Sequence, residues 1–302
     1  SDEVARISPM EIICNDQVKL RACLQREMQN ASEQPSAWFQ LANATEALCR
    51  HFALNDLSPL GLSDEYKAGA SAAGALMRYL SETQKNALEH MTSLRIYQGS
   101  ETMLLDRNTR RNLELTESIR GRSRKGSLLW LLDKTSTAMG GRLLRSWIEQ
   151  PLVDEAKINR RLDAVGEFAQ EHVLTMTLAE ELQGVYDIER LLSKVAYKSM
   201  NARDCLSLCA SLQKVPKIRE LLREAKSQAV EEIRDSLDTL PELTDLLTRA
   251  IHPDAPILIT EGGIIRDGYS QMLDEYRAAS TSGKQWILEL EQKEREETGI
   301  RN

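Results

Sequence analysis

Arginine and lysine are concentrated in one short segment of this chain, between residues 107 and 125. The segment holds seven cationic and two acidic residues, which gives a local net charge of +5. The cationic residues are Arg107, Arg110, Arg111, Arg120, Arg122, Arg124 and Lys125. Guanidinium groups bind phosphate and carboxylate oxygens, so the segment could contact nucleic acid or an acidic partner. No aromatic residue is interleaved with these cations, and the whole chain carries a net charge of −7. The residues therefore favour a solvated loop with internal ion pairs, and a phosphate contact is the competing interpretation.

A second group of cations lies in the charge-dense stretch that precedes the end of the chain. It adds two residues to the candidate contacts with DNA or a partner, which are then Arg107, Arg110, Arg111, Arg122, Arg124, Lys125, Lys293 and Arg295.

The residues needed for nucleotide binding or catalysis are missing from the sequence. A phosphate-binding loop requires GxxxxGK[ST], and around Gly283-Lys284 two required positions hold Ala278 and Gln285 instead. No GxSxG, HExxH or CxxC pattern occurs, the four histidines are far apart, and paired carboxylates are adjacent and so point to different helix faces. We expect no catalytic, cofactor or metal site in this chain.

The five cysteines are odd in number and scattered, which is typical of reduced thiols in a cytosolic protein rather than of a disulfide framework. Cys205 and Cys209 could form half of a metal site, but no histidine or second cysteine pair lies near them in sequence, which favours buried core thiols. The chain has no run of about 18 apolar residues, so we expect no membrane helix and a cytoplasmic location.

Good helix formers dominate the composition, while glycine and proline are sparse, so the fold class should be mainly α. Residues 10–14 predict a strand. A helix capped by Ser36 should run to Phe52, and a helix from about Asp64 carries small residues at 68–75 that should pack closely onto a sheet.

The rest of the chain reads as helices between two hairpins, at 93–106 and 256–266. Asp106, Thr137 and Asp154 are expected helix caps. Trp147 should lie on a buried apolar face, and Pro216 should end a helix. Further helices are expected over three ranges, the last with a break near 280–283: 217–235, 242–251 and 269–297.

Three stretches of the sequence resemble the MutS family of DNA mismatch-repair proteins. They contain GALMRYL (74–80), LDRNTRRNLEL (105–115) with GSLLWLLD (126–133) and TAMGGRLL (137–144), and GGII (262–265) with EREETGI (294–300). Their order and spacing agree with the family across essentially the whole chain.

The resemblance implies three parts: the later portion of an RNase-H-like α/β connector domain at 1–92, a helical core or lever domain at 93–285, and the lever end with the root of the clamp at 286–302. The family's mismatch-reading wedge would lie before this chain, and its clamp tip and P-loop ATPase after it. None of those functional residues can be carried over, and we expect the chain to be an internal fragment.

The function implied is mechanical coupling between the DNA clamp and the ATPase of a mismatch-recognition protein, with a surface for partner docking. The parent would bind ATP with Mg²⁺, double-stranded DNA with mismatches, a MutL-like partner and a second MutS-like copy, in the nucleoid-associated cytoplasm. Two alternatives stay open: a stand-alone helical protein-interaction scaffold, which the acidic charge favours, and a recombination-type MutS paralogue. The connector-like segment argues against the paralogues that lack a connector.

Overall fold

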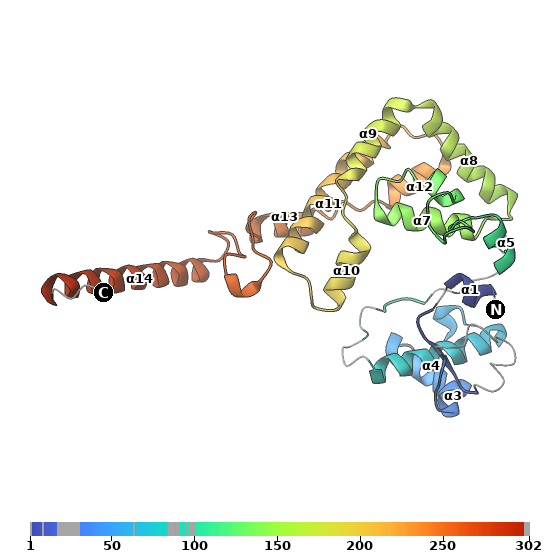
Figure 1. Ribbon diagram of the computed structural model, residues 1–302, viewed down its shortest axis with the longest axis horizontal. Coiled ribbons are helices and arrows are strands. Elements are labelled where there is room, and N and C mark those ends of the chain that lie inside the picture. The colour runs from blue at the N-terminus through green and yellow to red at the C-terminus, as the bar shows by residue number, and fades with distance from the viewer. Residues whose placement is uncertain are drawn as a thin grey trace.

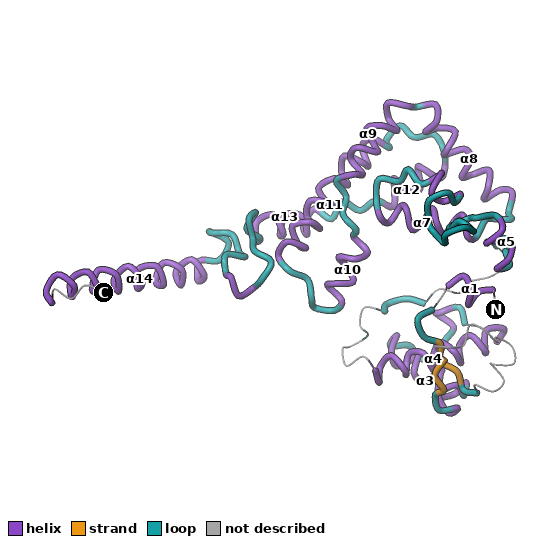
Figure 2. The backbone as a smooth tube through the Cα atoms, viewed as in Figure 1, coloured by secondary structure: helices purple, strands orange, loops and turns teal. Residues whose placement is uncertain are grey.

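The computed structural model describes residues 2–7, 9–16, 31–62, 64–83, 88, 91–94, 96 and 101–298. Helices dominate these residues, and one short pair of strands lies among them (Figures 1 and 2). The expected fold class, mainly α with part of an α/β domain at the N-terminal end, is confirmed.

The N-terminal part combines a small parallel sheet with helices. The expected strand at 10–14 is present as β1 (Ile12–Cys14), which pairs in parallel with β2 (Ala31–Glu33). The helices around it are α1 (Asp2–Ile7), α3 (Leu41–Phe52) and α4 (Lys67–Thr83), with 3₁₀ turns at Ser36–Phe39, Ser58–Leu60 and Asp64–Tyr66.

Ser36 does not cap α3, so that prediction was wrong. Ser36 begins a 3₁₀ turn instead, and the extended backbone of Gln40 precedes the first residue of α3 without a side-chain cap. The Ser36 hydroxyl lies 3.5 Å from the carbonyl oxygen of Asn15, which ties the turn to the end of β1.

In the described part of the chain, α4 packs closely at Gly74 against helix α3, where the expectation was packing onto a sheet. A Cβ added at Gly74 would lie 2.5 Å from both the Cβ and the carbonyl oxygen of Ala44 on α3, and closer still to its Cα. Ala44 is 1 % exposed, and Leu48, one turn later, is fully buried. The absence of a side chain at Gly74 therefore sets how closely the two helices approach.

The second part is a succession of helices, and three of its predicted caps are confirmed. Asp106, Thr137 and Asp154 each accept a backbone N–H in the first turn of the helix that follows. The helices are α5 (Arg107–Asn112), α6 (Leu128–Leu132), α7 (Ala138–Glu149), α8 (Glu155–Gln170), α9 (His172–Gln183), α10 (Ile188–Ala196), α11 (Ala202–Leu221), α12 (Gln228–Ser236) and α13 (Pro241–Ala250).

Pro216 lies inside α11 and does not end it, contrary to prediction, and residues 217–221 belong to the same helix. Proline removes one intrahelical hydrogen bond, a cost that packing can offset. Leu212 is buried in one apolar cluster with Leu191 and Leu208, and Ile218 is buried in a second. Because α11 is anchored on both sides of the proline, the helix continues through it.

Helix α7 buries none of its residues, so the expected buried face around Trp147 is also wrong. The Trp147 side chain is 39 % exposed, and the guanidinium of Arg161 lies 3.8 Å from its ring centre. The stacked guanidinium shields one face of the Trp147 ring from solvent, as apolar side chains would in a core.

Neither expected hairpin forms two paired strands in the described residues. At 256–266 the chain makes a wide loop, and Ile265 pairs with Ile251 in an antiparallel bridge. In the first region, Thr102 pairs with Leu152 from beyond α7, while residues 95 and 97–100 of the expected hairpin lie outside the described residues. In each region, one residue therefore forms a single bridge to a segment outside the expected hairpin.

The last helix, α14 (Gln271–Thr298), is continuous and extends away from the other helices (red in Figure 1). The expected break near 280–283 does not occur, since Gly283 is helical and costs only about 1 kcal/mol relative to alanine. A helix of 28 residues is roughly 42 Å long. No helix in the described ranges combines the length and apolar character needed to cross a membrane.

Candidate functional site

Four of the predicted contact residues line one cleft of about 500 Å³. They are Arg107, Arg110, Arg111 and Arg122, and the fold adds Arg6 from α1 and Arg145 from α7. We call this the arginine cleft. Sequence reasoning missed Arg6 and Arg145 because each stands far along the chain from residues 107–125, and only the packing of α1 and α7 near α5 brings them there.

Helix α5 presents three of these arginines on little more than one turn, and Asp106 fixes that turn. Its carboxylate accepts hydrogen bonds from the backbone N–H groups of Asn108 (2.7 Å) and Thr109 (2.9 Å), and from the Thr109 hydroxyl (2.7 Å). The two hydrogen bonds from Thr109 are the main cause that holds the pKa of Asp106 below its ordinary value, and the bond from Asn108 and the charge of Arg110 act in the same direction. The cap stays ionised at neutral pH and keeps the helix start in place.

The loop after α5 folds back and brings Arg122 beside the helix. Glu114 and Arg122 both adopt a left-handed backbone, each with φ of 47°. The Glu114 carboxylate accepts the N–H of Ile119 at 2.6 Å, and the N–H of Ser118 donates to the Ser123 carbonyl at 2.9 Å. The loop after α5 is therefore a compact turn held by its own hydrogen bonds.

Positive charge exceeds negative charge in the cleft, where six arginines face Glu117 and Glu149. Glu149 accepts from Arg145 at 2.9 Å, and Arg6 pairs with Glu3 outside the cleft at 2.7 Å. Arg110 differs, because its Nε and Nη1 are buried and have no hydrogen-bond partner among the described residues. Buried cationic donors are normally satisfied, so among the described arginines that line this cleft Arg110 is the one with buried donors that lack a partner.

The other predicted contact residues lie elsewhere. Arg124 forms an ion pair with Asp133, and Lys125 is exposed outside the cleft. Lys293 and Arg295 lie on α14, at the opposite end of the molecule from α5 (Figure 1), and Arg295 pairs with Glu291 at 2.7 Å. The eight candidates therefore do not form one surface.

A second polar cluster joins helices far apart in sequence. The guanidinium of Arg142 on α7 donates to both carboxylate oxygens of Asp187, at 2.9 and 2.7 Å, and to Glu189 at 3.0 and 2.6 Å. Asp187 also caps α10 by accepting the N–H of Arg190. Arg142 is the main cause of a lowered pKa at Asp187. The carboxylates of Asp187 and Glu189 in turn raise the pKa of Arg142.

This ion pair predicts an acid-sensitive contribution to stability. Since the folded pKa of Asp187 lies below its ordinary 3.8, the contribution is complete above that value and is lost as pH falls through the folded pKa. In Arg142→Gln, the loss of thermal stability relative to the unchanged chain should be full at pH 7 and pH 5 and should shrink toward pH 3. Melting curves across that pH range test this. An equal loss at every pH would contradict it, and Arg249→Gln, in an exposed pair within α13, is the control.

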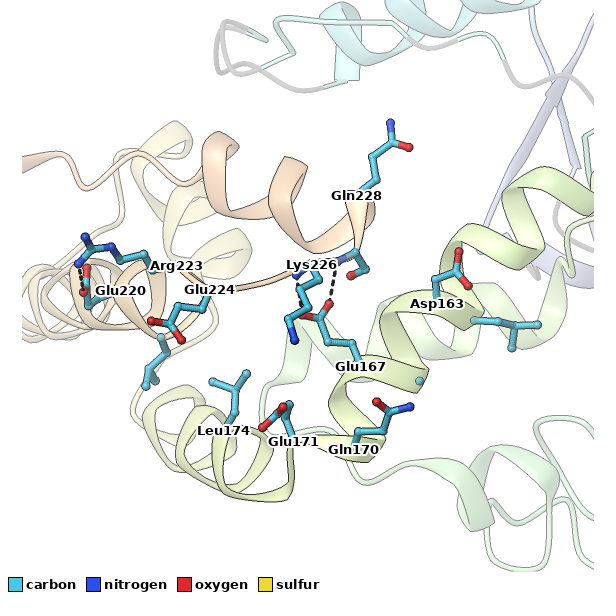
Figure 3. Close-up of a pocket in the computed structure, with 14 residues that line it drawn as sticks. Asp163, Glu167, Gln170, Glu171, Leu174, Glu220, Arg223, Glu224, Lys226 and Gln228 are labelled. Atoms are coloured by element: carbon cyan, nitrogen blue, oxygen red, sulfur yellow. Dashed lines mark hydrogen bonds and ion pairs between the residues drawn. The ribbon is translucent and has the colours of Figure 1, made fainter.

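A cavity of about 910 Å³ lies between α8, α9, α11 and α12 (Figure 3). Its central carboxylate, Glu167, accepts the backbone N–H groups of Lys226 at 2.7 Å and Ser227 at 2.9 Å. Glu167 thus holds the segment leading into α12, a structural role. No group of three or more His, Cys, Asp or Glu side chains within the described ranges could hold a metal ion.

Residues 278–285, the nearest approach to a phosphate loop, lie inside α14. Backbone N–H groups in the middle of a helix already bond carbonyl oxygens four residues earlier, so they cannot surround a phosphate. This segment does not fit ATP.

Comparison with known proteins identifies both parts of the chain. Residues 1–92 match the family model described as MutS domain II, and residues 108–299 match MutS domain III. Similar curated proteins include three named DNA mismatch repair protein MutS. The protein from Lachnoclostridium phytofermentans is 41% identical over 100% of this chain and 33% of its own length. The protein from Halothermothrix orenii is 43% identical over 99% of this chain and 34% of its own length. The protein from Listeria monocytogenes is 50% identical over 76% of this chain and 27% of its own length.

The chain spans about a third of the length of the curated relatives that it matches end to end. Family matches cover the connector-like part and the helical part, in the order that the sequence motifs predicted. The chain belongs to the MutS family, of which it carries domains II and III.

Proposed function

We propose that this chain serves DNA mismatch repair as the mechanical connection between the DNA clamp and the ATPase of a mismatch-recognition protein. In this proposal, residues 1–92 are connector, 93–285 are core and lever, and 286–302 are the lever end and clamp root. The names of the relatives and the two domain matches support it. The second boundary falls inside α14, so there it divides a continuous helix.

The supporting observation is an unbroken series of contacts from α7 to α14. Arg142 joins α7 to α10, and α10 packs through Leu191 on Leu208 and Leu212 of α11, while Cys209 of α11 lies 3.3 Å from the Thr248 hydroxyl of α13. After α13, the N–H of Arg266 donates to the Ala250 carbonyl at 2.8 Å. Packed helices in such a series are rigid elements that can transmit a two-state change between distant sites.

Arg277 joins this series to α14. Its Nη1 lies 2.6 Å from Asp267, and its Nη2 donates to the Ile265 carbonyl at 2.8 Å. Ile265 is the residue that pairs with Ile251 after α13. One guanidinium therefore fixes the start of the projecting helix to the end of the packed ones.

The remaining functions belong to the proposed parent protein. It would bind mismatched double-stranded DNA, ATP with Mg²⁺, a MutL-like partner and a second MutS-like copy, in the cytoplasm at the nucleoid. The candidate contacts with DNA or a partner in this chain stay those predicted: Arg107, Arg110, Arg111, Arg122, Arg124, Lys125, Lys293 and Arg295. Relatives named as mismatch-repair proteins favour neither a stand-alone scaffold nor a recombination-type paralogue.

The coupling proposal predicts the effect of Arg277→Gln in a protein that carries this chain together with the regions its relatives have beyond it. The factor by which DNA changes the rate of ATP hydrolysis should fall roughly 2- to 30-fold, the range that disruption of a coupling element gives. DNA affinity and ATP hydrolysis without DNA should change little, because Arg277 belongs to neither site. Steady-state hydrolysis with and without mismatched duplex measures the factor.

Arg223→Gln is the matched control, since the side chain of Arg223, just after the end of α11, forms an exposed ion pair with Glu220 three residues earlier and not with another helix of the described part of the chain. An unchanged coupling factor in Arg277→Gln, or an equal fall in both variants, would count against a mechanical role for this contact series.

A further inference from the structure

We propose that the arginine cleft is a binding site for a phosphate group, with Arg110 as its central ligand. The proposal rests on the candidate contact surface named above, and it specifies the chemistry of the ligand and the residues that hold it. It does not depend on coupling between the clamp and the ATPase.

The incomplete contacts of Arg110 are the first support. Its Nε and Nη1 are both removed from solvent, and neither meets an acceptor among the described residues, although Arg110 lines the cleft. A buried cationic donor that has lost water and gained no acceptor is unfavourable. An acceptor that enters the cleft would remove that penalty by drawing the Arg110 guanidinium out toward it.

The kind of anion follows from the charges already present. Glu149 is a carboxylate in the cleft, and it engages Arg145 without satisfying Arg110. Six arginines against two glutamates leave a net charge of +4 in the cleft. A phosphate group offers more acceptor oxygens and more negative charge than one carboxylate, and guanidinium forks match its oxygens in pairs.

The architecture of the cleft favours a site over a diffuse basic surface. Its cations come from α1, α5, the loop after α5 and α7, and the capped turn at Asp106 fixes three of them. Neutral polar residues, Asn108, Thr116 and Ser118, complete the lining. A volume of about 500 Å³ suits a phosphate or short polyphosphate, whether free in solution or part of a DNA backbone.

Calorimetric titration of the 302-residue chain with inorganic tripolyphosphate, in phosphate-free buffer at low salt, tests the proposal. Saturable binding with one site per chain is expected. Arg110→Gln should weaken it roughly 10-fold or more, the effect of losing a charge-assisted hydrogen bond. Arg120→Gln makes the same charge change in the loop that follows α5 but outside the cleft lining, and should change affinity less than about 3-fold, as expected for an exposed charge that makes no hydrogen bond to the anion.

If Arg110→Gln does not fold, as judged by circular dichroism, Arg111→Gln at an exposed position of the cleft replaces it and should also weaken binding more than Arg120→Gln. Absence of saturable binding, or equal weakening by the cleft variant and Arg120→Gln, would overturn the proposal. A duplex that displaces tripolyphosphate in an Arg110-dependent manner would identify the DNA backbone as the source of the phosphate. Failure of duplex to displace it would identify a free anion, and either result supports the site.

Discussion

Gly74→Ala is expected to destabilise the contact between α3 and α4 by about 3 kcal/mol, near the upper end of the usual cost of overpacking. The added methyl group would lie 2.5 Å from the Cβ and carbonyl oxygen of Ala44, and part of what it meets is backbone, which cannot rotate away. The two helices must move apart, and such movement exposes Leu48, now fully buried. Amide hydrogen exchange of α3 and α4 measures the local opening free energy.

Gly69→Ala is the matched control on the same helix. A Cβ at Gly69 meets nothing within 4 Å, so the substitution should stabilise α4 by about 0.5–1 kcal/mol through helix propensity alone. The opposite signs separate packing from propensity. If both substitutions change exchange protection in the same direction, close approach at Gly74 does not determine the helix contact.

The row of small residues at 68–75 illustrates what sequence alone could supply. It predicted a close approach, and the structure has one, but it could not say which element approaches. Small side chains permit contact with a helix or a sheet equally well, so the neighbour, α3, was identified only by the fold. For the same reason, the two apolar runs at 257–259 and 264–265 predicted strands that pair with each other, whereas Ile265 instead forms a single bridge to Ile251.

Local signals succeeded where the relevant chemistry is local. Asp106, Thr137 and Asp154 cap helices because a side-chain oxygen needs only a backbone N–H two or three residues later. The arginine cleft could be predicted only in part, because some of its residues come from distant parts of the chain. Four of its arginines are close in sequence, but Arg6 and Arg145 enter through tertiary packing, which no spacing rule describes.

Leu191→Ala is expected to cost about 2–5 kcal/mol, the usual range for a buried leucine. Leu191 is 7 % exposed and packs on Leu208 and Leu212 of α11, with Ile188 and Leu247 around them. Truncation leaves a cavity between α10 and α11 that these neighbours fill only in part. Hydrogen exchange should therefore accelerate in α10 and α11 and remain unchanged in α4, because α4 belongs to the other part of the chain.

Leu192→Ala is the control that sequence alone would have treated as equivalent. Leu192 is the next residue on the same helix, but its side chain is 55 % exposed, so truncation should cost less than about 1 kcal/mol, little more than the apolar area it removes. Equal losses for the two leucines would show that α10 is not held through the face that bears Leu191. A loss of stability confined to Leu191→Ala would show that the contact between α10 and α11 is one of the rigid contacts that a coupling element requires. A loosely attached helix α10 could not transmit a displacement from α7 to α11.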